Sequence, residues 1–184
     1  VTITAVQDTK DEVDETVIVD IASVTNGTEA TPQSVTTTIT DDDTSGITVS
    51  AISANTTEAG GTATFTVVLN TQPTADVTVG LTSDDTTEGT IAVSNVVFTA
   101  ANWSTPQTIT VTGANDALAD GNINYNIVTA AATSTDGNYN TVNANDVAVI
   151  NTDDDAAGIT VSAISANTTE AGGTATFTVV LNTQ

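Results

Sequence analysis

Carboxylates are the only abundant side chains in this chain that could bind a ligand or take part in catalysis. The 184 residues contain 23 Asp and Glu, one basic residue, Lys10, and no His or Cys. Three consecutive aspartates, Asp153, Asp154 and Asp155, repeat a triplet that occurs earlier at residues 41–43. Such oxygen-only ligand sets suit Ca²⁺, which takes about 6–8 oxygen ligands in loose geometry. Zn²⁺ would call for His or Cys, and Mg²⁺ for a strict octahedron.

The same composition argues against catalysis and against several kinds of partner. Acid–base and nucleophilic catalysis draw mostly on His, Cys, Lys or an activated hydroxyl, and the one Lys lies near the N-terminus. We therefore predict that the chain is not an enzyme. The net charge of −22 excludes a basic nucleic-acid interface, and no run approaches 18 apolar residues. We predict neither nucleic-acid binding nor membrane insertion.

A long internal repeat divides the chain. Residues 46–72 return letter for letter as residues 158–184, an offset of 112. A period of this length indicates tandem copies of whole domains rather than a solenoid of short units. We predict one complete repeat at residues 46–157, the end of a preceding repeat at residues 1–45, and the start of a following repeat at residues 158–184.

The complete repeat has the pattern of an antiparallel β-sandwich. Short stretches alternate apolar with polar residues, as half-buried strands do. They lie at residues 47–52, 63–69, 77–81, 109–111, 123–127 and 147–149. Residues 91–98 change phase at Ser94 and Asn95, which predicts one further strand with a bulge. Seven strands, with no helical period, predict an all-β, immunoglobulin-like sandwich in which Trp103, Tyr125 and Tyr139 pack in the core.

The partial repeats are predicted to follow the same scheme. Residues 1–45 correspond to the last three strands, with residues 1–4 aligned to the strand around Ile109. Residues 158–184 correspond to the first two strands. A neighbouring chain could complete these unfinished repeats by strand addition. The simpler alternative is that the sequence is a piece cut from a continuous array of such repeats.

The strand order places most acids at one pole of the sandwich. When strands run up and down alternately, every second loop lies at the same end. Nine carboxylates from four segments then share one pole, and three lie at the other. The nine are Glu58, Asp84, Asp85, Glu88, Asp116, Asp120, Asp153, Asp154 and Asp155. Like charges about 4 Å apart near a surface repel by roughly 4 kcal/mol per pair, against a domain stability of about 5–15 kcal/mol. We predict that Ca²⁺ relieves this repulsion; the alternative is that the acids only keep the protein soluble.

Four segments of the repeat carry a resemblance to a known family: residues 57–65, 115–116, 120–121 and 153–155. On these segments the repeat resembles the Calx-beta domain, a calcium-binding β-sandwich of sodium–calcium exchangers and of large bacterial surface proteins. The resemblance implies a calcium site in the complete repeat and matching residues in the partial ones. The implied ligands are Glu58, Asp84 or Asp85, Asp116, Asp120, Asp153, Asp154 and Asp155, with Asp8, Glu12, Asp41, Asp42, Asp43 and Glu170 in the partial repeats.

The repeats and the resemblance together predict a structural role. We expect a segment of a large secreted bacterial protein that forms an extended, calcium-stabilised fibre, filament or stalk at the cell surface or in a biofilm matrix. Expected partners are the neighbouring repeats and identical chains in a filament. A metal at residues 153–155, beside the next repeat, would stiffen the joint. The alternative is an adhesin repeat that directly binds a glycan or protein ligand, although aromatic residues make up only 3% of the chain.

Overall fold

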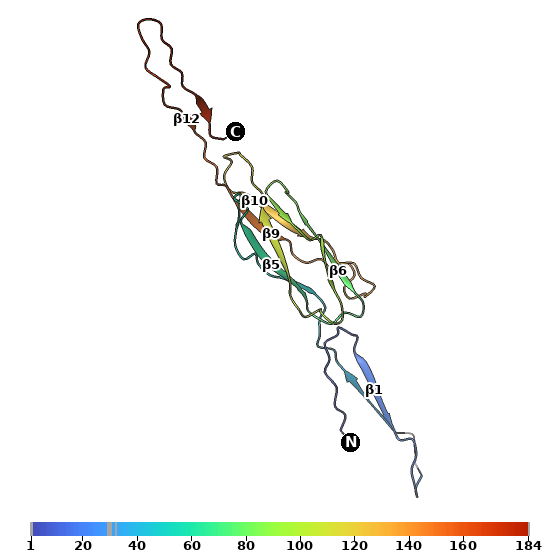
Figure 1. The fold of residues 1–184 in the computed structure, drawn as a ribbon. Coiled ribbons are helices and arrows are strands. Elements are labelled where there is room, and N and C mark those ends of the chain that lie inside the picture. Colours follow the sequence, from blue (N-terminus) through green and yellow to red (C-terminus); the bar gives the residue numbers. More distant parts are fainter. Residues whose placement is uncertain (1, 29–30, 32, 184) are drawn as a thin grey trace.

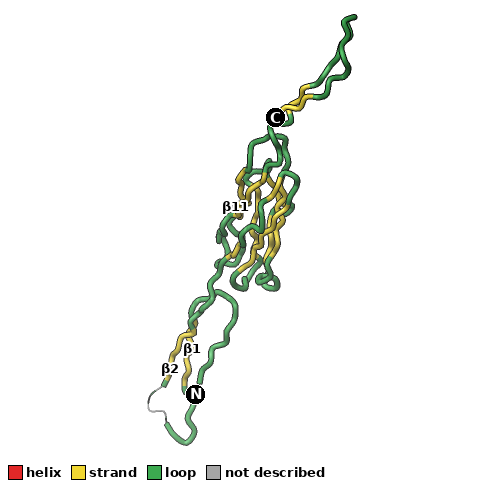
Figure 2. The backbone as a smooth tube through the Cα atoms, turned by 90° about the vertical axis from the view of Figure 1, so that its left-hand side faces the viewer, coloured by secondary structure: helices red, strands yellow, loops and turns green. Residues whose placement is uncertain are grey.

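The computed structural model describes residues 2–28, 31 and 33–183. In these ranges every regular element is a β-strand and no helix occurs, which confirms the all-β prediction. It follows that no helix in the described ranges could cross a membrane. The described strands fall into a central body of two sheets and two separate hairpins. The hairpins extend from opposite ends of this body (Figures 1 and 2).

The N-terminal hairpin consists of β1 (Glu15–Asp20) and β2 (Ser34–Ile39), and the C-terminal hairpin of β12 (Ile159–Val161) and β13 (Val179–Leu181). The central body, which we call the central sandwich, contains the other nine strands. They are β3 (Ile47–Val49), β4 (Thr56–Thr57), β5 (Thr62–Leu69), β6 (Val77–Ser83), β7 (Gly89–Ile91), β8 (Asn95–Phe98), β9 (Gln107–Gly113), β10 (Ile123–Thr129) and β11 (Val147–Thr152).

Two sheets pack face to face in the central sandwich. One has the strand order β3-β5-β9-β7 and the other the order β4-β11-β10-β6-β8. All described strand pairs are antiparallel except β4 and β11, which run parallel. The expectation of a purely antiparallel sandwich is therefore wrong at this edge. A strand as short as β4 is invisible to a period-of-two search, because two residues define no alternation.

The alternating residues of each strand meet in one core. On β5, Phe65 and Val67 are buried, while Thr64 and Thr66, which alternate with them, are half-buried. Phe65 lies directly opposite Ile109 of β9, which is also buried. The predicted aromatic packing is confirmed, because Tyr125 and Tyr139 are buried in this core and Trp103 packs against it. Burial of this aliphatic surface is the main stabilising term for the sandwich.

The segment predicted as one bulged strand at residues 91–98 is instead two strands in different sheets. β7 pairs with β9, whereas β8 pairs with β6 in the opposite sheet. A bulge shifts the alternation within one sheet, and a crossing to the facing sheet shifts it in the same way. The phase change at Ser94 and Asn95 therefore could not distinguish the two structures.

The two hairpins keep the registers of their counterparts in the sandwich. Ile159 pairs with Leu181 as Ile47 pairs with Leu69. The strand predicted at residues 1–4 does not form at residues 2–4, and Val1 lies outside the described residues. In the sandwich the corresponding strand, β9, pairs with β5, and no copy of β5 precedes residues 2–4 in this sequence.

Candidate metal centre

The short parallel pairing of β4 with β11 positions Glu58. Thr57 lies opposite Thr152, and the next backbone amide, that of Glu58, donates a 3.1 Å hydrogen bond to the Thr152 carbonyl. Directly after Glu58 the chain turns at Gly60, whose φ of 79° is readily adopted only by glycine. The Glu58 side chain is 2% exposed, and its Oε2 accepts a long 3.4 Å hydrogen bond from the Asp154 amide.

Four aspartates from two further segments surround this glutamate. One carboxylate oxygen from each of Glu58, Asp120 and Asp153 lies within 4.8 Å of the other two, and the same holds for Glu58, Asp116 and Asp155. Hydrogen bonds order these loops. Asp153 accepts from the amides of Gly121 and Asp155 at 2.8 Å each, and Asp116 accepts from the Leu118 amide at 2.7 Å.

Glu88 belongs to the same pole but was missing from the implied ligand set. It is 6% exposed and forms a third such group with Asp116 and Asp120. Its Oε2 accepts a 3.4 Å hydrogen bond from the Asn151 side chain, which in turn accepts one from Thr56 at 3.0 Å. In the sequence, the feature that could have indicated the buried position of Glu88 is the adjacent Gly89. A Cβ there would collide with the buried Tyr125 ring, so the chain passes tightly against the core at this point.

The other acids implied in that loop face elsewhere. Asp84 accepts hydrogen bonds from the backbone and side-chain amides of Asn126 at 2.7 and 2.9 Å, and Asp85 accepts one from the Thr87 amide at 3.0 Å. Among the described residues neither takes part in a group of three converging acids, and the same is true of Asp154 and Glu170. Asp154 is exposed and contributes its backbone amide to Glu58, while Glu170 is exposed on the C-terminal hairpin.

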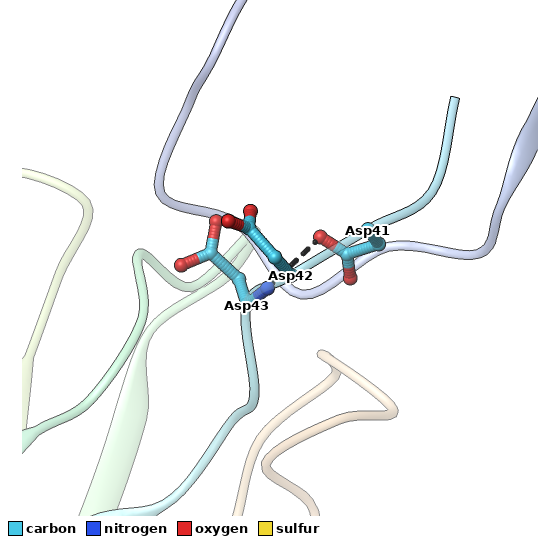
Figure 3. A group of neighbouring side chains, drawn as sticks. All are labelled: Asp41, Asp42 and Asp43. Carbon is cyan, nitrogen blue, oxygen red and sulfur yellow. Dashed lines mark hydrogen bonds between the residues drawn. The ribbon is translucent and has the colours of Figure 1, made fainter.

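A second acidic group lies at the N-terminal end of the sandwich. Asp41, Asp42 and Asp43 each offer an oxygen within 4.8 Å of the others (Figure 3). The Asp43 amide donates to Asp41 at 3.2 Å, the bond that Asp155 makes to Asp153. Asp8 and Glu12 line the same hollow as the triplet without joining the group. Asp8 accepts from the Lys10 amide at 2.9 Å, just as Asp116 accepts from Leu118.

This N-terminal group lies at a joint between two parts of the chain. The Thr9 carbonyl accepts a 2.7 Å hydrogen bond from the Gln72 amide of the sandwich, and the Asp11 carbonyl accepts a 2.6 Å bond from the Asn138 side chain. Ser45 donates its amide to the Asp11 carboxylate at 2.9 Å and its hydroxyl to the Asn138 carbonyl at 3.1 Å. An acidic loop of the N-terminal segment is therefore hydrogen-bonded to the pole of the sandwich opposite Glu58.

Each group contains carboxylates whose ionised form is disfavoured by their surroundings. Burial raises the pKa of Glu58, and the charges of Asp153, Asp116 and Asp120 raise it further against one opposing hydrogen bond. Burial and nearby aspartates also raise the pKa of Glu88, Asp155 and Asp43. By contrast, hydrogen bonds from Asn126 lower the pKa of Asp84. The groups that converge are thus the ones a bound cation would stabilise.

The donor set is one that a hard divalent cation accepts. Two oxygens bound to one Ca²⁺ at about 2.3–2.6 Å are at most about 5 Å apart, and the grouped oxygens lie within 4.8 Å of one another.

No protein-family model matches the chain, and no curated protein matches it.

Proposed function

We propose that this chain is a structural, non-enzymatic segment of a large secreted bacterial protein, built from tandem immunoglobulin-like sandwiches of the Calx-beta type that bind Ca²⁺. In this proposal successive sandwiches form an extended extracellular fibre, filament or stalk. The observation that carries it is the convergence of a buried glutamate, Glu58, with four aspartates at the pole where the sandwich meets the next repeat.

A bound Ca²⁺ would compensate the negative charge of the buried carboxylates, which no basic side chain at this pole does. The chain has one basic side chain, Lys10, and it lies in the N-terminal segment rather than at this pole. Bringing carboxylates together away from water costs free energy unless a cation or hydrogen bonds compensate. Three such groups overlap at this pole, and any two of them have one residue in common, either Glu58, Asp116 or Asp120; this supports more than one ion at the pole.

The distribution of charge supports an end-to-end arrangement. The strands β2 to β13 contain no Asp, Glu or Lys, so apart from β1 the charges lie in the loops and connecting segments. The triplet Asp153, Asp154 and Asp155 precedes the next repeat by two residues, and the triplet at residues 41–43 stands in the same relation to Gly46. Ions at these triplets would brace consecutive repeats along one axis, in line with the extended shape in Figure 1.

The direct test is thermal unfolding of the 184-residue chain in EGTA and in millimolar Ca²⁺. Saturating calcium at about 100 times its Kd should stabilise the folded state by about 2.7 kcal/mol, a rise of roughly 10 °C or more in Tm. The double variant Asp153→Asn, Asp155→Asn should lose most of this rise.

The matched control is Asp76→Asn, because Asp76 is exposed at the opposite pole. It should keep the full calcium response. If calcium leaves the Tm of the wild-type chain unchanged, the acids are surface charge and the calcium proposal is wrong.

A further inference from the structure

The acidic loop of the N-terminal segment, residues 8–12, contacts the sandwich through its main chain rather than through its side chains. The Thr9 carbonyl accepts the 2.7 Å hydrogen bond from the Gln72 amide, and the Asp11 carbonyl accepts the 2.6 Å bond from the Asn138 side chain. Every residue carries a backbone carbonyl. These two contacts therefore do not depend on which side chains the loop has at the two positions.

The two donors of the sandwich are held in place by its core. Gln72 directly follows Thr71, and Asn138 directly precedes Tyr139. The buried Tyr139 hydroxyl accepts a 3.0 Å hydrogen bond from the Thr71 amide and donates one of 2.8 Å to the Thr71 carbonyl. This pair links the two segments from which the donors extend.

A buried carboxylate joins the same two segments a second time. Asp136 is 6% exposed and accepts hydrogen bonds from the Thr74 amide at 2.7 Å and from the Asn138 amide at 3.0 Å. Hydrogen bonds to an ionised acceptor are stronger than those between neutral groups. The surface is therefore formed before any loop binds to it, which reduces the entropy lost on docking.

The acidic loop keeps its shape when its sequence changes. In the N-terminal segment Asp8 accepts a 2.9 Å hydrogen bond from the Lys10 amide, and in the sandwich its counterpart Asp116 accepts a 2.7 Å bond from the Leu118 amide. The intervening residues differ between the two loops. The turn that presents the two carbonyls is thus a property of the loop itself.

We propose that the pole of the sandwich formed by Gln72 and Asn138 is a docking surface for the acidic loop of the preceding repeat, and that the docked loop holds consecutive repeats in one orientation without calcium. The connecting segment tethers the loop to the surface, so the contact forms within one chain at a high effective concentration. A few hydrogen bonds then suffice, since each shifts the equilibrium about two- to tenfold. Extension to every junction of an array rests on the proposed function, whereas the contact at this pole does not.

The two junctions of this chain are expected to differ in strength. At the first, Ser45 adds two bonds, from its amide to the Asp11 carboxylate at 2.9 Å and from its hydroxyl to the Asn138 carbonyl at 3.1 Å. At the second, the counterparts of Ser45 and Asp11 are Ala157 and Ala119, which lack the hydroxyl and the carboxylate that these bonds need. Only the bonds to main-chain carbonyls remain available there. The second junction should therefore bend more readily.

The experiment is amide hydrogen exchange of the full 184-residue chain, followed by NMR in EGTA and in Ca²⁺. The Gln72 amide is the reporter, because it donates to the Thr9 carbonyl. It should be protected in both buffers. Asn138→Ala should speed its exchange about two- to tenfold by removing one bond. The double variant Asp11→Ala, Ser45→Ala removes two bonds, reproduces the residues of the second junction and should have the larger effect.

An internal reference and a matched variant control for the fold. The Thr71 amide, which donates to Tyr139 inside the sandwich, should stay protected in every variant. Asn145→Ala changes an exposed asparagine in the same connection between β10 and β11. It should leave the exchange of the Gln72 amide at the wild-type rate.

The orientation of the two parts is measured on the same variants. The chain has no cysteine, so Thr37→Cys on β2 and Thr110→Cys on β9 give two specific sites for spin labels, and both positions are exposed. Pulsed electron spin resonance in EGTA should give one narrow distance distribution for the otherwise wild-type chain. Asn138→Ala should broaden it, and the double variant Asp11→Ala, Ser45→Ala should broaden it further.

The outcomes separate docking from calcium binding. A Gln72 amide that is unprotected in EGTA overturns calcium-independent docking, whether or not Ca²⁺ restores the protection. Protection that Asn138→Ala leaves unchanged overturns the assignment of the surface. Protection that Asn138→Ala reduces equally in both buffers supports the docking surface even if calcium has no effect on the chain, a result that would count against the calcium proposal alone.

Discussion

Residues 46–72 and 158–184 are the same 27 amino acids in two surroundings. Both form a hairpin in one register, and their hydrogen bonds agree in detail. The Ser50 amide donates to Thr66 and the Ser162 amide to Thr178, each at 2.9 Å. Yet the first copy extends β5 over eight residues and adds β4, whereas the second has a three-residue β13 and no counterpart of β4.

The difference shows which properties of this segment are local. Register and turn recur without neighbours because they depend on residues within the hairpin. Strand length, the parallel edge and burial of the apolar face appear only where β9 and β11 lie alongside. Four experiments test this division, from the largest expected effect to the smallest.

The largest contrast is expected at the shared phenylalanine. Phe65→Ala removes a fully buried ring and should lower the free energy of unfolding of the sandwich by about 3–5 kcal/mol. Phe177→Ala should change it by less than about 0.5 kcal/mol, because its ring is outside that core. Urea denaturation of dilute, monomeric protein measures both. Equal losses would mean that the second hairpin is part of the same folding unit.

The glutamate at the same position in the two copies, Glu58 or Glu170, should contribute to calcium binding in the first copy only. Glu58→Gln should weaken calcium affinity more than about tenfold, since even indirect partners of metal ligands contribute that much. Glu170→Gln should leave the affinity of the monomeric chain unchanged. Isothermal titration calorimetry distinguishes them. Loss of affinity in Glu170→Gln alone would contradict the assignment of Glu58.

In EGTA, the pH dependence of stability should reveal the buried acids of the first copy. The pKa of Glu58 and Glu88 is raised above the ordinary 4.5, so the folded state binds more protons than the unfolded state above this pH. Stability therefore rises as pH falls from 7 towards 4.5. Calcium should reverse this slope, because protons compete with the metal.

Below pH 3.8 the dependence of stability on pH changes sign. Hydrogen bonds lower the pKa of Asp84, and hydrogen bonds outweigh burial to lower the pKa of Asp136, so their stabilising contribution is lost as pH falls through their folded values. Thermal melts across this range in EGTA should pass through a maximum. Glu58→Gln should reduce the change in Tm on the high-pH side of this maximum, whereas Glu170→Gln should not. A profile that falls steadily from pH 7 would refute the assignment of raised pKa values.

The smallest effect concerns the turn that both copies share. Gly60 and Gly172 have φ values of 79° and 90°, where a side chain costs about 1 kcal/mol. Gly60→Ala should lower the free energy of unfolding of the sandwich by about this amount. Gly172→Ala should leave global unfolding unchanged and increase only hydrogen exchange within its hairpin. A global effect of Gly172→Ala would show that the second hairpin is not independent.

Much of the candidate site followed from the sequence because acids cluster in loops whose end of the sandwich depends only on strand order. Glu58, Asp116, Asp120 and the triplet at residues 153–155 could be placed at one pole in this way. The sequence could not show that Glu88, rather than Asp84 or Asp85, converges with these acids, because all three residues share one loop. The outcome depends on Gly89 passing against Tyr125 and on Asn126 holding Asp84, and both contacts are distant in sequence.

The amino-acid order by itself determined the all-β class, the strands with clear alternation and the register of each hairpin. These depend on side-chain direction and turn geometry, which act over a few residues. Only the tertiary structure decided that residues 89–91 and 95–98 enter opposite sheets, that Thr56 and Thr57 pair with β11, and that Phe65 is buried while Phe177 is exposed. Each of these outcomes requires a partner surface far along the chain. Identical residues therefore differ in pairing and burial wherever that partner differs.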